Sequence, residues 1–336
     1  MKKTLVITTI NKPNKNINFF SRYCKKNKWE MIVVGDKKTP KNYKLRYGDF
    51  YSLLKQKELK FSFSKICPKN SYSRKNIGYL LAILNKTDII IETDDDNSPK
   101  RNFFKNIQLK YKVRQLLGSD WVNVYLNFLK KKNEKIWPRG LPLEYIYNRP
   151  VLNSKKIVSE FYLQQGVCEG NPDVDAIYRL TNPKINIKFK NNYRYSLGKC
   201  LSPFNSQNTI WFKKIFPLLY LPVTCTMRCT DIWRSLVALA ILRNDNKKIL
   251  FFGTTMYQER NYHNLIDDFE QEIPMYLNNQ NIFNILSKMR FKKGIKNYLV
   301  NLKSAYKALV KNNFVSRLEL KYLDLWINDF NLINKN

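Results

Sequence analysis

The stretch that decides the fold is Ile89-Ile90-Ile91-Glu92-Thr93-Asp94-Asp95-Asp96, an apolar run that ends in three consecutive aspartates. An apolar run without alternation is typical of a strand that is buried on both faces, as in a parallel sheet. Ligands of such sheets bind beyond the carboxyl ends of the strands. The three aspartates therefore stand where a functional site is expected.

The residues before this run alternate between strand and helix patterns. Residues 5–10 and 30–36 are short apolar runs, whereas residues 17–28 and 73–84 space their apolar side chains as a helix does. Strands separated by helices predict an α/β fold with a mostly parallel sheet that is covered on both faces.

The charge of the chain is its most unusual bulk property. The 336 residues include 60 Lys and Arg against 26 Asp and Glu, which gives a net charge of +34. Such a charge favours anionic partners, namely nucleic acid, acidic lipid headgroups or phosphorylated substrates. The excess is mostly Lys and comes with many Asn, Ile, Tyr and Phe, a composition that AT-rich codons also produce. No RNA-binding motif of basic and aromatic residues stands out, so nucleic acid is disfavoured.

The C-terminal part differs from the rest. From about residue 282 the pattern is helical, with Lys and Arg on one face and apolar residues on the other. We therefore predict an α/β domain over residues 1–280 and a basic helical region over residues 281–336. The basic region is a candidate for peripheral contact with an anionic membrane.

Targeting signals are not evident in this sequence. The apolar run after Lys2 and Lys3 is too short for a signal peptide, and no stretch approaches the ~18 apolar residues that span a bilayer. The six cysteines are scattered and fit neither a disulfide framework nor a zinc pattern. We expect a cytoplasmic protein with reduced, partly buried thiols.

The aspartate triplet predicts a metal site. Consecutive residues that leave a strand point in alternate directions, so Asp94 and Asp96 can face one point while Asp95 turns away. Two carboxylates suit Mg²⁺ or Mn²⁺, with phosphates and waters completing the coordination shell. This is the arrangement of the DxD motif in nucleotide-sugar transferases. An acidic turn that caps the next helix, or the carboxylates of a phosphatase or nuclease, are the alternatives.

Several stretches resemble the STELLO family of glycosyltransferase-like proteins. They are residues 6–11, 32–36, 76–80, 91–97, 171–176, 203–209, 227–234 and 258–264. The resemblance runs from about residue 3 to 275 and leaves the basic tail outside. It implies a GT-A glycosyltransferase fold and a nucleotide-sugar donor, expected to be a UDP-sugar. The triplet and residues 173–176 are also similar to the reversibly glycosylated polypeptides, which include UDP-arabinopyranose mutases.

Strand ends and a helix start supply the predicted nucleotide site. Thr8, Thr9, Asn11 and Asp36 follow strands, where GT-A proteins hold the nucleoside. Arg74, Lys75 and Asn76 open the helix before the aspartate strand, and a helix N-terminus with added positive charge suits an anion. Asp95 completes this set. Turn and surface roles remain the alternatives.

The other predicted roles fall to residues between positions 173 and 263. His263, the only histidine, is predicted as a third metal ligand beside Asp94 and Asp96, by similarity to GT-A enzymes. Asp231 precedes an apolar helix and is predicted as the general base, with Asp175 as the alternative; an N-cap is the structural interpretation of Asp231. The predicted sugar-binding residues are Asp173, Asn205, Gln207, Asn208, Arg228 and Arg260.

The predicted function is a metal-dependent glycosyltransferase with a glycan or lipid-linked acceptor, as in polysaccharide biosynthesis. The plant members of the family are Golgi proteins with an N-terminal anchor, to which no stretch of residues 1–336 corresponds. That difference makes a cellulose-synthase partnership doubtful. The alternatives are a UDP-sugar mutase or self-glycosylating protein on the same scaffold, and a catalytically silent scaffold or binding protein.

Overall fold

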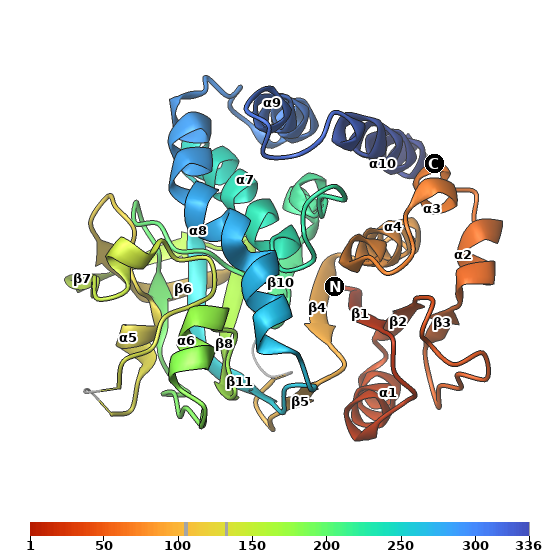
Figure 1. Cartoon of the computed structure of the whole chain (residues 1–336), viewed down its shortest axis with the longest axis horizontal. Coiled ribbons are helices and arrows are strands. Elements are labelled where there is room, and N and C mark those ends of the chain that lie inside the picture. The colour runs from red at the N-terminus through yellow and green to blue at the C-terminus, as the bar shows by residue number, and fades with distance from the viewer. Residues whose placement is uncertain (104–106, 132–133, 336) are drawn as a thin grey trace.

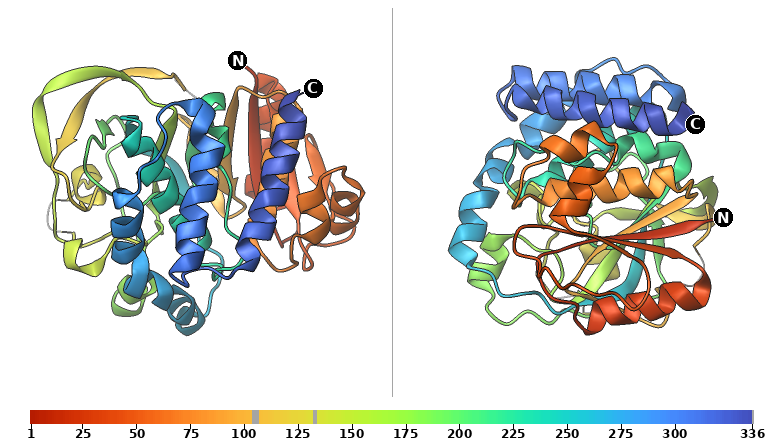
Figure 2. Two further views of the ribbon diagram at one scale, coloured as in Figure 1. Left: turned by 90° about the horizontal axis from the view of Figure 1, so that it is seen from above. Right: turned by 90° about the vertical axis from the view of Figure 1, so that its right-hand side faces the viewer.

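A single large sheet organises the chain. The computed structural model describes residues 1–103, 107–131 and 134–335 (Figure 1). Its 11-stranded sheet has the order β3-β2-β1-β4-β10-β8-β11-β9-β6-β7, with β5 paired to β11. Helices lie on both faces of the sheet (Figure 2). The predicted α/β class is therefore confirmed.

The first half of the sheet is wholly parallel. It comprises β1 (Lys3–Thr9), β2 (Glu30–Gly35), β3 (Asp49–Tyr51) and β4 (Ile89–Asp94). Thr8 pairs with Val34 on one side and with Asp94 on the other, so the carboxyl ends of β1, β2 and β4 meet at one edge. The apolar runs predicted these strands correctly. Every residue from Ile89 to Thr93 is buried, as expected for a strand that is covered on both faces.

Two helices cover this half on opposite faces. Helix α1 (Lys15–Asn27) begins at Asn14, whose side chain accepts a hydrogen bond from the Ile17 amide. Helix α4 (Lys75–Leu84) packs at Gly78, where an added Cβ would lie 2.6 Å from a Val6 methyl group. Glycine thus allows α4 to approach the sheet closely enough to seal the core.

The second half of the sheet is mixed, and here the prediction of a mostly parallel sheet holds only in part. Strand β10 (Thr209–Phe212) runs antiparallel between β4 and β8 (Leu163–Gly170), whereas β8 and β11 (Ile249–Gln258) are parallel. The remaining strands are β5 (Asn97–Pro99), β6 (Lys110–Leu117), β7 (Val151–Glu160) and β9 (Arg194–Ser196). Strands β6 and β7 pair as an antiparallel ribbon at the sheet edge.

Short helices connect these elements. They are α2 (Leu53–Glu58), α3 (Ser62–Ile66), α5 (Tyr125–Phe128), α6 (Ala176–Thr181), and the 3₁₀ turns η1 (Tyr72–Arg74), η2 (Leu143–Tyr145), η3 (Lys213–Leu218) and η4 (Ile295–Asn297). All six cysteines are free, and all but Cys225 are buried.

The C-terminal helices pack onto the rest of the chain. They are α7 (Thr230–Asn244), α8 (Leu265–Lys288), α9 (Tyr298–Lys311) and α10 (Leu318–Lys335). The buried Glu319 carboxylate in α10 accepts hydrogen bonds from Tyr220 and the Thr224 amide, and Asp329 accepts the amides of Ser62 and Phe63. Helix α8 passes through residue 280, so the predicted boundary there falls inside a helix. The division into two parts stays a prediction.

One hydrophobic cluster includes residues from both predicted parts, such as Leu5 in β1 and Trp326 in α10. In the described part of the chain, no helix has the length and apolarity that crossing a membrane requires.

A buried ion pair holds strand β4, which ends in the aspartate triplet. The Arg234 guanidinium in α7 donates to both oxygens of Glu92 at 2.8 and 3.0 Å, and both side chains are almost fully buried. Trp211 Nε1 and the Tyr79 hydroxyl also donate to Glu92. Because Glu92 lies two residues before Asp94, this cluster fixes the end of β4 that enters the site.

Candidate functional site

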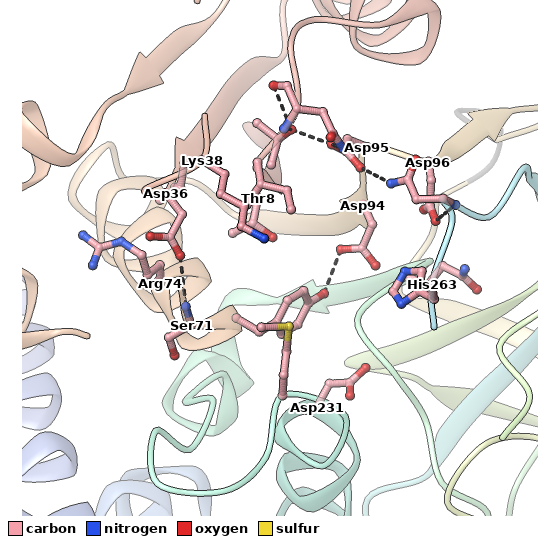
Figure 3. Close-up of a pocket in the computed structure, with 18 of the residues that line it drawn as sticks. Thr8, Asp36, Lys38, Ser71, Arg74, Asp94, Asp95, Asp96, Asp231 and His263 are labelled. Atoms are coloured by element: carbon pink, nitrogen blue, oxygen red, sulfur yellow. Dashed lines mark hydrogen bonds between the residues drawn. The ribbon is translucent and has the colours of Figure 1, made fainter. Parts of the chain in front are cut away.

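A cavity of about 470 Å³ opens at the carboxyl ends of β1, β2 and β4 (Figure 3). Most of the residues that line it are polar or charged. Of the predicted site residues, the wall contains Thr8, Thr9, Asn11, Asp36, Arg74, Asp94, Asp95, Asp96, Asp173, Gln207, Arg228, Asp231, Arg260 and His263. Residues far apart in sequence thus share one cavity, as the strand-end pattern predicts.

The three aspartates point toward different partners. Asp94 Oδ1 accepts hydrogen bonds from the Tyr72 hydroxyl at 2.7 Å and from Lys75 Nζ at 2.8 Å. Asp95 turns toward β1, where its carboxylate accepts from Thr9 and from Asn11 Nδ2 at 3.0 Å. Asp96 accepts from Gln258 Nε2 at 3.1 Å. The side chains of Asp94 and Asp96 therefore point in other directions than the side chain of Asp95.

Burial shifts the pKa values of the two outer aspartates. It raises the pKa of Asp94 to about 6, against the lowering effect of the Lys75 ammonium and with a further rise from the Asp96 charge. It also raises the pKa of Asp96, where the hydrogen bond from Gln258 acts in the opposite direction. Burial disfavours the ionised form of both carboxylates. A cation placed between them would favour that charged form.

The donors present fit a divalent cation only in part. Two carboxylates are the usual protein contribution to an Mg²⁺ or Mn²⁺ site that also uses substrate phosphates. Among residues 1–103, 107–131 and 134–335, however, no three His, Cys, Asp or Glu side chains group as a metal site. His263 Nδ1 instead lies 3.3 Å from Asp268 Oδ1. The predicted ligand set of Asp94, Asp96 and His263 is therefore not assembled in this structure.

The β2 end of the cavity is built by Asp36. Its carboxylate accepts the backbone amides of Asn70 at 2.9 Å and Ser71 at 3.0 Å, and so holds the loop before η1 against β2. Lys38 and Thr8 line the wall beside it. Asp36 thus has a structural role in addition to the predicted nucleoside contact.

The helix start at residues 74–76 differs from the predicted anion site. Arg74 lines the cavity, but its guanidinium donates to Gln56 and to the Cys67 and Pro68 carbonyls. Lys75 is directed to Asp94, and the Asn76 side chain is bonded to the backbone of Leu221. All three side chains are thus bonded to other groups of the protein. The role of Arg74, Lys75 and Asn76 in binding the nucleotide stays a prediction.

A buried ion cluster forms the wall opposite the aspartate triplet. Arg139 donates to both oxygens of Asp173 at 2.8 and 2.9 Å, and its Nη2 lies 3.0 Å from each oxygen of Asp231. Burial acts to raise the pKa of Asp173, but the Arg139 charge outweighs it, and the pKa lies below its ordinary value. Asp173 is therefore held as an anion.

Arg228 and Arg260 extend this wall. Arg228 donates to Glu272 at 2.6 and 2.8 Å, and Arg260 is paired with Asp268. Burial, followed by the neighbouring Arg228 charge, lowers the pKa of Arg260. Two guanidinium groups facing one cavity suit an anionic or hydroxyl-rich ligand.

Five predicted residues lie outside the cavity wall, namely Lys75 and Asn76 described above and Asp175, Asn205 and Asn208. Asp175 caps α6 by accepting the Tyr178 amide at 2.8 Å and also accepts from Trp137 Nε1; burial raises its pKa to about 6. Asn205 is bonded to Asp173 and Gln165, and Asn208 to Thr255. These interactions stabilise the residues that line the cavity, although these three side chains do not line it themselves. The structure does not support the predicted catalytic role of Asp175 or direct sugar contacts from Asn205 and Asn208.

The prediction missed Arg139 and Tyr72, which both line the cavity. Arg139 lies between Pro138 and Gly140 in a turn-rich loop, and Tyr72 lies between the two serines that precede the predicted helix. No local pattern indicates that Arg139 meets Asp231, which is 92 residues further along the chain.

Comparison with known proteins supports the predicted family. The family model described as STELLO glycosyltransferases matches residues 228–335. Probable glycosyltransferase STELLO2 of Arabidopsis thaliana is 24% identical over 330 residues, and STELLO1 of the same plant is 25% identical over 322 residues. These matches cover 91% and 90% of this chain. The resemblance to STELLO proteins is confirmed, and it supports the prediction of a glycosyltransferase.

The comparison also corrects one expectation. The matched residues 228–335 include the basic C-terminal region, which was expected to lie outside the resemblance. The packing of α9 and α10 onto the core gives the physical reason. The chain spans only 42% and 41% of the lengths of the two Arabidopsis relatives.

Two solved structures are similar at low identity. A mycobacterial protein has a TM-score of 0.45 and 10% identity, with 83% of this chain and 74% of that chain covered. The glucosyl-3-phosphoglycerate synthase of M. tuberculosis has a TM-score of 0.42 and 12% identity, with 83% and 80% covered.

Proposed function

We propose that this protein is a glycosyltransferase that moves a sugar from a nucleotide donor to an acceptor hydroxyl. One observation carries the proposal. The carboxyl ends of three parallel strands place Thr8, Asp36 and Asp94 around one cavity, which is where sheets of this kind bind nucleotides. The similarity to STELLO proteins supports the same class of reaction.

The donor is proposed to be a UDP-sugar that lies along the triplet side of the cavity. Thr8, Asn11, Asp36 and Lys38 would contact the nucleoside, and the diphosphate would lie next to Asp94 and Asp96. These two carboxylates would hold Mn²⁺ or Mg²⁺, which when bound neutralises the diphosphate leaving group. Arg228 and Arg260, which line the opposite wall, would contact the transferred sugar or its phosphate.

Asp231 is proposed as the residue that accepts the proton of the acceptor hydroxyl. It lines the cavity at the first turn of α7 and receives the Ser206 amide at 3.2 Å in addition to Arg139. These donors fix the orientation of the carboxylate toward the cavity. General-base catalysis of this kind contributes roughly 10²–10⁴ in rate.

The acceptor is proposed to be a glycan or a lipid-linked sugar, at a cytoplasmic membrane surface. The basic charge of the C-terminal region supports contact with a membrane. Helix α9 carries the exposed Lys307 and Lys311, and Lys296 is exposed just before it. Charged side chains of this kind attract anionic lipid headgroups.

Turnover with a panel of UDP-sugars and acceptors tests the proposal. Release of UDP that requires both a divalent cation and an acceptor supports a transferase. The Asp94→Asn, Asp96→Asn double variant should lose this activity by at least about 10³-fold, because oriented charge at a leaving group is worth several kcal/mol. The matched control is Asp49→Asn with Glu58→Gln, which removes two exposed carboxylates outside the cavity.

The same assay separates the alternatives. A donor whose ring form changes without transfer to an acceptor indicates a mutase, and label retained on the protein indicates self-glycosylation. Absence of any donor binding with the cation present would contradict the transferase and favour a scaffold.

A further inference from the structure

One lysine differs from nearly all others in this lysine-rich chain. The Lys75 side chain is 0% exposed, although it begins helix α4 at the edge of the cavity. A buried ammonium group is costly unless all its hydrogens are bonded and its charge is paired. Lys75 Nζ lies 2.8 Å from the Tyr72 hydroxyl, 2.8 Å from Asp94 Oδ1 and 3.4 Å from the Ser206 carbonyl. It therefore has three acceptors, of which Asp94 is the anion.

This pairing changes what a divalent cation would meet. Asp94 Oδ1 is shared by the ammonium and the Tyr72 hydroxyl, and within the described residues Oδ2 takes no hydrogen bond. Asp96 is also engaged, by Gln258 Nε2 and by the Asn261 amide at 3.4 Å. The cation would therefore meet one neutralised carboxylate, one engaged carboxylate and, among the residues that the structure describes, no third acidic or histidine ligand.

A nucleotide diphosphate would supply what is missing. Mg²⁺ and Mn²⁺ prefer several oxygen ligands, and substrate phosphates often provide them. The negative charge of the diphosphate would also offset the positive charge that Lys75 places beside the site.

We propose that Lys75 makes cation binding conditional on the nucleotide, so that the free protein binds Mn²⁺ weakly and takes up the cation and the diphosphate together. The inference rests on the proposed donor site and adds the order in which its parts assemble. By linkage, Mn²⁺ strengthens UDP binding by the same factor by which UDP strengthens Mn²⁺ binding. Lys75 acts here as a positioning residue, through Asp94.

Calorimetric titration of Mn²⁺ with and without UDP tests this role. Wild-type protein should bind Mn²⁺ at least about tenfold more tightly when UDP is present. Lys75→Met, which removes the charge and keeps a long side chain, should raise the Mn²⁺ affinity of the nucleotide-free protein by about tenfold or more. Tyr72→Phe is the matched control, since it removes a hydrogen bond to the same oxygen but leaves the ammonium, and it should change that affinity by less than about threefold.

The outcomes separate this inference from the proposed function. UDP binding that depends on Mn²⁺, together with an unchanged Mn²⁺ affinity in a folded Lys75→Met protein, overturns the role of Lys75 alone. If that variant does not fold, equal Mn²⁺ affinities of the wild-type protein with and without UDP overturn it equally. A wild-type protein that binds no UDP at any Mn²⁺ concentration overturns the proposed donor, and this inference with it.

Discussion

Arg139 Nη2 lies 3.0 Å from both carboxylate oxygens of Asp231, so the loop that contains Arg139 fixes the first turn of α7. The same guanidinium also binds Asp173. Two acidic residues from different parts of the chain are thereby held on one wall of the cavity. The contact joins a loop, a helix and a strand end that no local sequence pattern connects.

Loss of Arg139 should destabilise the fold. Arg139→Leu leaves Asp173 and Asp231 buried without their cation, and breaking a buried pair in this way costs about 3–5 kcal/mol. Arg139→Lys retains a charge and should cost less, although one ammonium cannot make the bidentate contacts. Urea denaturation monitored by tryptophan fluorescence measures both free energies of unfolding. Equal stability of the leucine variant and the wild type would contradict the assigned cluster.

Asp175 should make stability depend on pH in a predictable direction. Its pKa of about 6 in the folded protein lies above the ordinary value near 3.9, so the folded state binds the proton more tightly. Its contribution to stability therefore falls as pH rises from about 4 to about 6 and stays low above that range.

Comparison with Asp175→Asn isolates this contribution, because asparagine is also a good N-cap. Denaturation at pH 4 and pH 8 should show the wild type losing about 2–3 kcal/mol relative to the variant at the higher pH. Asp175→Ala is the control that removes the cap and the charge together. A difference between wild type and Asp175→Asn that is the same at both pH values would rule out the raised pKa.

The Glu92–Arg234 pair should be critical for folding. Glu92→Gln leaves the buried Arg234 without its anion and should lower the free energy of unfolding by about 3–5 kcal/mol. Glu30→Gln, at a partly exposed pair with Lys2, is the matched control and should change stability by less than about 1 kcal/mol. Comparable losses in the two variants, measured by thermal and chemical denaturation, would show that the buried pair has no special weight.

Membrane contact should depend on the basic face of the C-terminal helices. Deletion of this region is a poor test because α9 and α10 cover part of the core. Charge reversal at Lys296, Lys307 and Lys311 leaves the buried faces intact and should abolish flotation with vesicles that contain anionic lipid. The control reverses Arg22, Lys25 and Lys26 in α1, with the same total charge change. Equal loss of flotation in both variants would indicate non-specific attraction by the net charge.

The sequence was most informative where a pattern is local. The apolar runs of β1, β2 and β4 and the aspartates that follow β4 predicted the parallel half of the sheet and the edge that holds the cavity. The antiparallel β10 was not predicted, because an apolar run does not reveal the direction of its neighbours. Arg139 and Lys75 show the same limit, since their roles depend on which buried carboxylate each one meets across the fold. Asn205 and Asn208 were predicted as ligand contacts because a sequence does not distinguish amides that face a cavity from those behind its wall.

Calorimetric titration of UDP in the presence of Mn²⁺ tests the central claim most directly. The wild-type protein should bind UDP, and the Asp94→Asn, Asp96→Asn double variant should lose at least about 100-fold in affinity while it keeps the wild-type melting temperature within a few degrees. The Asp49→Asn, Glu58→Gln control should bind as the wild type does. UDP binding by the double variant with wild-type affinity and the same dependence on Mn²⁺ would contradict the assignment of these two aspartates and of the site built around them.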